Sequence, residues 1–148
     1  AWACDKLKPA ALIDLATLTG AVVVTLGRHH AGLFSNDDGL ARAALDAGTA
    51  TGEALWRLPL SKAMDEDLKS AIADIRNCGW GRLPDALDAA RFLEGFVAEG
   101  VKWAHLDIAG VAEIEDDQRL CPKGATGFGV RLLDHLIRQG FEDTGLRP

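Results

Sequence analysis

The chain has 148 residues, of which 48% are hydrophobic and 26% are charged, so its composition is that of one ordinary globular domain with room for a core. A net charge of −6 argues against a nucleic-acid-binding surface, and no apolar run approaches the roughly 18 to 20 residues that cross a membrane. Three cysteines without a C-x-x-C spacing (Cys4, Cys78 and Cys121) argue against a disulfide framework or a zinc knuckle and favour the reducing cytoplasm.

The first 26 residues predict a helix end, then a strand, then a segment of ambiguous structure. AWACDKLKP (1–9) alternates small, apolar and charged residues and ends in Lys-Pro, like the last turns of a helix. We therefore expect the N-terminus to be a cut within a longer protein. Residues 10–17, rich in Ala, Leu and Ile, predict a strand buried on both faces. The valines of segment 21–26 favour a strand, whereas the preceding Gly20 also allows a helix start.

Turn and capping residues mark the next elements. Residues 36–39 (NDDG) offer the N-cap of a helix that Gly48 is expected to end. Ser61 is expected to cap a second, polar helix. The elements predicted between residues 31 and 69 are a short apolar run at 31–35, a helix at 40–47, a short strand or extended piece at 55–59, and a polar helix that includes 65–69.

The second half of the chain continues the alternation. One helix shows the strongest periodicity, with apolar residues at i, i+3, i+4, i+7 and i+8 between Ala89 and Val97. Because strands alternate with helices, the sequence predicts an α/β layer fold. The elements predicted here are a loop at 76–86, the periodic helix ended by Gly100, a buried strand at 101–110, a polar, acidic loop at 111–123, and a final helix at 127–139.

Two groups of histidines invite a metal or catalytic interpretation. His29 and His30 are adjacent, so in extended chain they point in opposite directions, and we interpret them as loop histidines near a turn. His105 and Asp107 lie two apart on one face of a predicted strand, where they could share a metal or orient a catalytic triad. No G-x-S-x-G motif accompanies them, so a hydrogen-bonded structural pair is favoured.

Two further groups resemble ligand loops but lack the required spacing. Residues 123–127 (KGATG) place the lysine before the glycines, so a helix-entry turn capped by Thr126 is favoured over a phosphate loop. An acidic cluster lacks the spacing and central glycine of a calcium loop, so a solvated loop is favoured. The cluster consists of Glu113, Glu115, Asp116 and Asp117.

The stretch Thr17-Leu18-Thr19-Gly20 interrupts the first apolar run. In α/β proteins, ligands bind in the crevice outside the carboxyl ends of strands, and glycine lets a ligand approach the backbone closely. The alternative is a strand ended by glycine with the threonines packed nearby. The residues alone leave both interpretations open.

Four segments of the sequence resemble the C-terminal half of the leucyl aminopeptidase family, which are cytosolic two-metal peptidases of the M17 type. The segments are LIDLATLTG, LWRLPL, WAHLDIAG and PKGATGFGVRLL. The resemblance runs from about Ala1 to Arg138. It implies an α/β catalytic domain with a central mixed sheet flanked by helices. It also implies a cytoplasmic enzyme that removes N-terminal amino acids from peptide substrates and assembles as a hexamer.

The resemblance further implies two divalent metal ions, zinc or manganese, that activate a water and polarise the scissile carbonyl. In the family, two metal-binding carboxylates and an arginine lie in an Asn-Thr-Asp-Ala-Glu-Gly-Arg motif, which this sequence does not contain. We therefore expect residues 1–148 to be the C-terminal portion of one catalytic domain, without metal ligands or catalytic residues. Alone, it would bind neither ion and be inactive, and it would associate as an oligomer or with a complementary N-terminal fragment.

The substrate floor is the part of the family site that matches this sequence. By resemblance, the Leu18 carbonyl and the Gly20 N–H hydrogen-bond the bound peptide. Thr17, Gly20, Ala109 and Ala112 match the lining of the pocket for the N-terminal side chain. Their small size leaves an apolar space suited to Leu-like or Met-like groups.

The loop at 77–90 departs from the family pattern, since Trp80 is inserted and Asp88 replaces a threonine. This loop borders the leaving side of the substrate in the family. Its departure motivates an alternative function, a non-catalytic α/β module for assembly or ligand binding. DNA binding, a side role of some family members, has no support from a net charge of −6.

Overall fold

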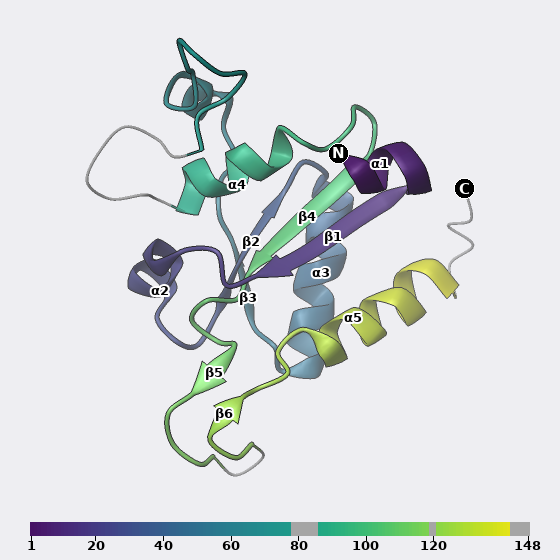
Figure 1. Cartoon of the computed structure of the whole chain (residues 1–148). Coiled ribbons are helices and arrows are strands. Elements are labelled where there is room, and N and C mark those ends of the chain that lie inside the picture. The colour runs from purple at the N-terminus through teal and green to yellow at the C-terminus, as the bar shows by residue number, and fades with distance from the viewer. Residues whose placement is uncertain (78–85, 119–120, 143–148) are drawn as a thin grey trace.

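The computed structural model describes residues 1–77, 86–118 and 121–142. Its centre is a four-stranded sheet with the strand order β1-β4-β2-β3 (Figure 1). β4 runs parallel to β1 and antiparallel to β2, and β2 runs parallel to β3, so the sheet is mixed. The strands are β1 (Ala11–Ala16), β2 (Ala31–Ser35), β3 (Leu55–Arg57) and β4 (Lys102–Asp107).

Helices flank the sheet, which confirms the predicted α/β fold (Figure 1). The helices are α1 (Trp2–Leu7), α2 (Gly20–Leu26), α3 (Asp38–Thr51), the 3₁₀-helix η1 (Lys62–Glu66), α4 (Ala86–Glu94), α5 (Val130–Ile137) and the π-helical turn η2 (Arg138–Glu142). α3 and α5 pack with Ala104 and Leu106 of β4 in the larger core. α2 and α4 pack with Phe34 in a second cluster. No helix in the described ranges is long and apolar enough to cross a membrane.

β1 forms one edge of the sheet. The strand predicted over 10–17 is confirmed, but the expectation of burial on both faces is wrong. All six β1 residues are half-buried, because β4 is the one strand paired with β1 in the described structure. The buried strand predicted over 101–110 is confirmed in β4, where every residue after Lys102 is buried.

The ambiguous segment 21–26 is helical, and a side-chain cap explains why. Thr19 has extended backbone angles, and its hydroxyl accepts a hydrogen bond from the Val22 N–H at 3.1 Å. This bond satisfies one of the N–H groups that lack a partner in the first turn of a helix. The cap and burial of Val22 against the sheet outweigh the strand preference of the valines.

The N-cap of α3 lies within 36–39 as predicted, and the helix extends beyond the predicted range 40–47 at both ends. Asp37 is its N-cap and accepts from the Leu40 N–H at 2.7 Å, and this bond is the main cause that lowers the Asp37 pKa. The expectation that Gly48 ends the helix is wrong. A Cβ at Gly48 would lie 2.6 Å from the Glu53 carbonyl oxygen, so glycine is required there for packing. The helix ends at Gly52, whose φ of 72° is left-handed.

Three other predicted elements differ from the structure in extent. The periodic helix ends at Glu94 rather than near Gly100, and Phe96 is 44% exposed beyond that end. The loop predicted over 111–123 contains β5 (Glu113–Ile114), which pairs antiparallel with β6 (Gly124–Ala125). The polar helix capped by Ser61 is the short helix η1. Most of the loop predicted over 76–86 lies outside the described residues.

A buried glutamate, Glu53, caps α5 from outside the helix. Its side chain is 3% exposed, and its Oε2 accepts from the N–H groups of Gly129 at 3.1 Å and Leu132 at 2.8 Å. The prediction that Thr126 caps this helix is wrong. The Thr126 hydroxyl donates to the Val111 carbonyl and accepts from the N–H of residue 128, in the turn before the helix.

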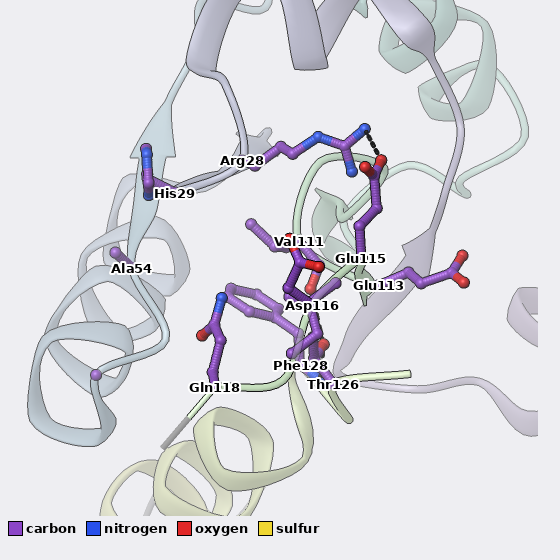
Figure 2. A pocket seen from close by; sticks show the side chains of 12 residues that line it. Arg28, His29, Ala54, Val111, Glu113, Glu115, Asp116, Gln118, Thr126 and Phe128 are labelled. Carbon is purple, nitrogen blue, oxygen red and sulfur yellow. Dashed lines mark hydrogen bonds and ion pairs between the residues drawn. The ribbon is translucent and has the colours of Figure 1, made fainter. Parts of the chain in front are cut away.

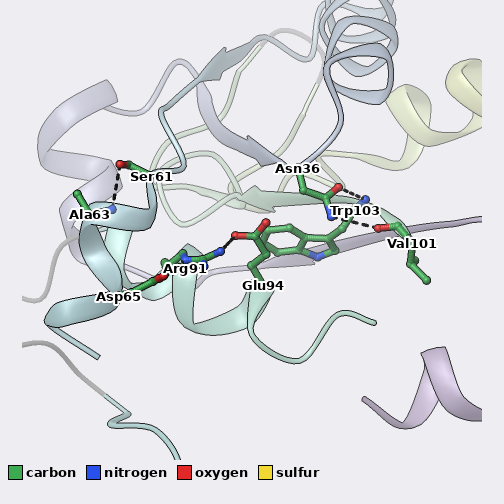
Figure 3. A network of polar contacts seen from close by, with 8 residues as sticks. All are labelled: Asn36, Ser61, Ala63, Asp65, Arg91, Glu94, Val101 and Trp103. Atoms are coloured by element: carbon green, nitrogen blue, oxygen red, sulfur yellow. Dashed lines mark hydrogen bonds and ion pairs between the residues drawn. The ribbon is translucent and has the colours of Figure 1, made fainter. Parts of the chain in front are cut away.

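Arg91 of α4 connects that helix to η1 (Figure 3). Its Nε lies 2.5 Å from Asp65 Oδ1, a second guanidinium nitrogen lies 3.2 Å from Asp65 Oδ2, and Nη1 bonds to Glu94. The guanidinium holds the pKa of the Asp65 carboxyl below its usual value of 3.8. The ion pair therefore stabilises the packing of η1 on α4 while Asp65 is ionised.

We expect Glu53→Gln to lower the free energy of unfolding by about 1 to 3 kcal/mol, because the amide is a weaker acceptor for the two N–H groups at the start of α5. Urea denaturation measures the change. Glu66→Gln, at an exposed carboxylate paired with Lys69, is the matched control and should leave the midpoint unchanged. Equal midpoints for both variants would contradict this role of Glu53.

We expect Arg91→Met to destabilise the protein by about 1 kcal/mol at pH 7, a modest value because the Asp65 side chain is 44% exposed. The Asp65 pKa is lowered by folding, so its contribution is present above the unfolded pKa and is lost as the pH falls through the folded pKa. The stability difference between wild type and variant should therefore shrink below about pH 4. Arg42→Met, at an exposed ion pair with Asp46, serves as the control. A difference that is constant between pH 3 and pH 7 would contradict the assignment.

Candidate functional site

The candidate site lies where β1 and β4 end side by side. The two strands are parallel and Ala16 pairs with Asp107, so both carboxyl ends lie at the same edge of the sheet. The Ile108 N–H donates to the Ala16 carbonyl at 2.9 Å, which keeps the chains together past the last paired residues. A loop over 17–19 leads from β1 into α2, and a turn over 108–112 follows β4. This edge is where ligands bind in α/β folds.

The Asp107 carboxylate joins the loop to the turn. The side chain is fully buried, and each of its oxygens accepts two hydrogen bonds. Oδ1 accepts from the Leu18 N–H at 3.1 Å and the Ala109 N–H at 3.2 Å. Oδ2 accepts from the Thr19 N–H at 3.2 Å and the Thr19 hydroxyl at 2.7 Å. The bonds to charged oxygen are stronger than neutral ones, so they hold the loop and the turn in one arrangement.

The loop exposes the groups that the family resemblance assigns to substrate. Thr17, Leu18 and Gly20 are exposed, whereas Thr19 is buried. Among the described residues, the hydrogen bonds that fold the loop use neither the Leu18 carbonyl nor the Gly20 N–H. A Cβ at Gly20 would meet no atom within 4 Å, so the space above this N–H is open.

The turn after β4 holds the other two predicted residues, Ala109 and Ala112. Both are half-buried, and Ala109 packs against the cluster around Val22 of α2. The Ala112 N–H donates to the Ile108 carbonyl at 2.9 Å, which closes the turn. The structure therefore places all five predicted substrate residues in the two segments that leave this edge of the sheet: Thr17, Leu18, Gly20, Ala109 and Ala112.

His105 and Asp107 share one face of β4 as predicted, but each has partners of its own. His105 Nδ1 lies 2.6 Å from Asp14 Oδ1, and Trp103 Nε1 donates to Asp14 Oδ2 at 2.7 Å. A carboxylate only accepts, so Nδ1 of His105 is the donor. Its buried Nε2 has no hydrogen-bond partner in the part of the chain that the structure describes. The expectation that His105 and Asp107 form one hydrogen-bonded pair is wrong.

A cavity of about 560 Å³ lies beside the turn, on the side of β5 and β6 (Figure 2). None of the five predicted substrate residues lines it. Glu113, Glu115 and Asp116 of the acidic cluster stand at its rim with exposed side chains, and Glu115 pairs with Arg28 at 3.0 Å. The lining residues are Arg28, His29, Gly52, Ala54, Val111, Glu113, Ile114, Glu115, Asp116, Gln118, Thr126 and Phe128.

The described residues do not fit a metal centre. They contain no group of three or more His, Cys, Asp or Glu side chains placed to hold an ion. The Asp107 oxygens are taken by four donors, and Asp14 is engaged by His105 and Trp103. His29 lines the cavity, while His30 packs edge-on against Trp56, so the adjacent histidines have separate surroundings.

The sequence pattern of the cytosol aminopeptidase family, catalytic domain, matches residues 1–134. The chain belongs to this family. A probable cytosol aminopeptidase of Dinoroseobacter shibae is 51% identical over 141 residues, which are 95% of this chain and 29% of that protein. One from Sinorhizobium fredii is 52% identical over 142 residues, 95% of this chain and 28% of that protein. The chain thus spans less than a third of the length of the curated relatives it matches.

Solved structures of the family have the same fold. A tomato leucine aminopeptidase mutant aligns with a TM-score of 0.84 at 42% identity, over 93% of this chain and 26% of that one. The bottromycin maturation enzyme BotP in complex with Mn aligns with a TM-score of 0.83 at 44% identity, over 88% of this chain and 29% of that one. These alignments confirm the family and fold that the four sequence segments predicted.

Sequence reasoning missed the residues that support the site, Asp107 and Thr19. The sequence pattern allows metal or triad chemistry for Asp107 and favours a hydrogen-bonded pair with His105, and it marks Thr19 only as part of a break. One signal could have found the contact, because a carboxylate in a buried apolar strand must be hydrogen-bonded. The polar hydroxyl and N–H groups just beyond the neighbouring strand were the available donors.

Proposed function

We propose that the whole protein to which this chain contributes is a metal-dependent aminopeptidase that releases Leu-like N-terminal residues from peptides. In this proposal, residues 1–148 are the C-terminal portion of one catalytic domain and supply its substrate floor. Membership of the cytosol aminopeptidase family supports the reaction class. The observation that carries the role of this chain is the exposed loop at the end of β1, anchored by Asp107 beneath it.

The floor binds peptide through backbone groups and small side chains. The Leu18 carbonyl accepts from a substrate N–H, and the Gly20 N–H donates to a substrate carbonyl. Thr17, Ala109 and Ala112 line an apolar space for the N-terminal side chain. Two backbone hydrogen bonds fix the direction and register of the peptide without reading its sequence, whereas the apolar space selects the terminal residue.

In this proposal, the hydrolytic chemistry belongs to a metal centre formed by other parts of the whole protein. In the proposal, two divalent ions, zinc or manganese, supply an activated water and polarise the scissile carbonyl. The related BotP structure is a complex with Mn, which supports the use of a divalent metal. The proposal assigns its ligands and the catalytic residues to other parts of the whole protein; among the described residues, no group of three or more His, Cys, Asp or Glu side chains is placed to hold an ion, which supports this. This chain binds and orients the substrate.

We further propose a cytoplasmic homo-oligomer, a hexamer by family resemblance, or association with a complementary N-terminal fragment. Two exposed apolar side chains on α1, Trp2 at 69% and Leu7 at 66%, support an association surface near the edge strand β1. The alternative, a non-catalytic assembly or ligand-binding module, rests on the altered loop at 77–88. Most of that loop lies outside the described residues, and no observation in the described part favours the alternative.

An assay on Leu-p-nitroanilide with added Mn²⁺ or Zn²⁺ tests the proposal. We expect turnover by the whole protein and none by residues 1–148 alone, because the proposal assigns the metal ligands to other parts of the whole protein. Metal-dependent turnover by the isolated chain would contradict the assignment of those ligands to other residues. An inactive, correctly folded whole protein would support the non-catalytic alternative.

We expect Gly20→Val in the whole protein to weaken binding of a Leu-peptide by about tenfold or more, because the branched side chain would cover the Gly20 N–H. The fold should tolerate the change, since a Cβ at this position meets nothing within 4 Å. Isothermal titration calorimetry measures the affinity. Val24→Leu, at a position of the same helix that is 89% exposed, is the control and should bind like wild type. Unchanged affinity in Gly20→Val would contradict the proposal that the Gly20 N–H binds the substrate.

A further inference from the structure

We propose that Asp107 is a positioning residue for the aminopeptidase reaction: its buried carboxylate sets the direction in which the Leu18 carbonyl and the Gly20 N–H face the substrate. The inference rests on the proposed function, because it concerns the same substrate floor. It adds a residue that touches no substrate and acts through the backbone of the loop over 17–19.

The planarity of the peptide bond connects Asp107 to the Leu18 carbonyl. The Leu18 carbonyl and the Thr19 N–H belong to one peptide unit, and in a trans unit these groups point in opposite directions. The Thr19 N–H points to Asp107 Oδ2 at 3.2 Å. The Leu18 carbonyl must therefore point away from the buried carboxylate, toward the exposed side of the loop.

A second chain of contacts connects Asp107 to the Gly20 N–H. The Thr19 hydroxyl donates to Asp107 Oδ2 at 2.7 Å and accepts from the Val22 N–H at 3.1 Å. The hydroxyl thus fixes the first turn of α2, of which Gly20 is the first residue. The same carboxylate also holds the turn that carries Ala109. The Asp107 side chain therefore fixes the relative positions of the Leu18 carbonyl, the Gly20 N–H and Ala109.

The fold contains a matched control for this role. Glu53 is also a buried carboxylate, 3% exposed, that accepts from two backbone N–H groups and from Arg131 Nε at 3.3 Å, but it acts at the start of α5 rather than at the floor. Asp107→Asn and Glu53→Gln are both isosteric and both remove one charged acceptor. Both variants thus lose a buried carboxylate that accepts hydrogen bonds. Only Asp107 contacts the loop over 17–19, whereas Glu53 does not.

Steady-state kinetics of the whole protein on Leu-p-nitroanilide test the inference, with thermal unfolding measured in parallel. In Asp107→Asn, two of the four donors face an NH₂ group instead of an oxygen, so the loop loses its fixed direction. We expect KM to rise about tenfold or more and kcat to change less than about threefold, since the floor binds substrate and transition state alike. Glu53→Gln should lower the melting temperature without changing KM.

Amide hydrogen exchange at Leu18 and Thr19 gives a readout of the loop itself, and both amides should exchange faster in Asp107→Asn. Faster exchange with an unchanged KM would overturn the inference while leaving the proposed function intact. Equal rises of KM in both variants would also overturn it, because the effect would then be one of stability. Absence of substrate turnover and binding in the wild-type whole protein would overturn the proposed function and this inference together.

Thr19→Val keeps the test decisive if Asp107→Asn does not fold. This variant removes the hydroxyl that donates to Asp107 and accepts from the Val22 N–H, and it leaves the three backbone N–H bonds to the carboxylate in place. We expect a smaller rise of KM, about threefold. A folded Thr19→Val protein with wild-type KM would count against the contact between Asp107 and the floor.

Discussion

The hydrogen bonds that converge on the Asp107 carboxylate are the constraint on which the candidate site depends. A buried ionised carboxylate is costly unless its oxygens are fully engaged, and here four donors engage them. The donors come from two segments, and the Leu18 donor lies 89 positions from Asp107 in the chain. The parallel pairing of β1 with β4 brings those segments to one edge, and the carboxylate then determines which backbone groups turn inward and which stay exposed.

The same device recurs elsewhere in the fold. Asp14 of β1 engages His105 and Trp103 of β4, and so cross-links the two strands whose ends form the site. Glu53 joins the segment after α3 to the start of α5. In each case a carboxylate with few free lone pairs connects elements distant in sequence. The contacts of Asp107 and Glu53 specify one arrangement because any other would leave a buried charge without partners, whereas the Asp14 side chain is 38% exposed.

The engagement of these carboxylates in internal hydrogen bonds is consistent with the proposal that this chain binds substrate and that other parts of the whole protein bind the metal ions. The Asp107 and Glu53 carboxylates are engaged in internal contacts, and the described residues contain no group of three or more His, Cys, Asp or Glu side chains placed to hold a metal. A rigid floor and a metal centre make opposite demands on a carboxylate, since the first requires its lone pairs to be filled and the second requires them open. In the proposed function, substrate orientation and metal chemistry therefore reside in different parts of the whole protein.

The sequence by itself determined the family, the α/β class, the two strands that meet at the site, an N-cap within 36–39 and the break at 17–20, because local periodicity, capping and short motifs encode them. Tertiary structure decided the features that depend on distant partners. Gly48 continues a helix because the Glu53 backbone passes within contact of it, and segment 21–26 is helical because Thr19 caps it and the sheet buries Val22. Asp107 became the support of a loop, rather than a ligand or triad member, because β1 ends beside it. Spacing along one chain shows which residues can do chemistry, but only the pairing of strands shows which donors reach them.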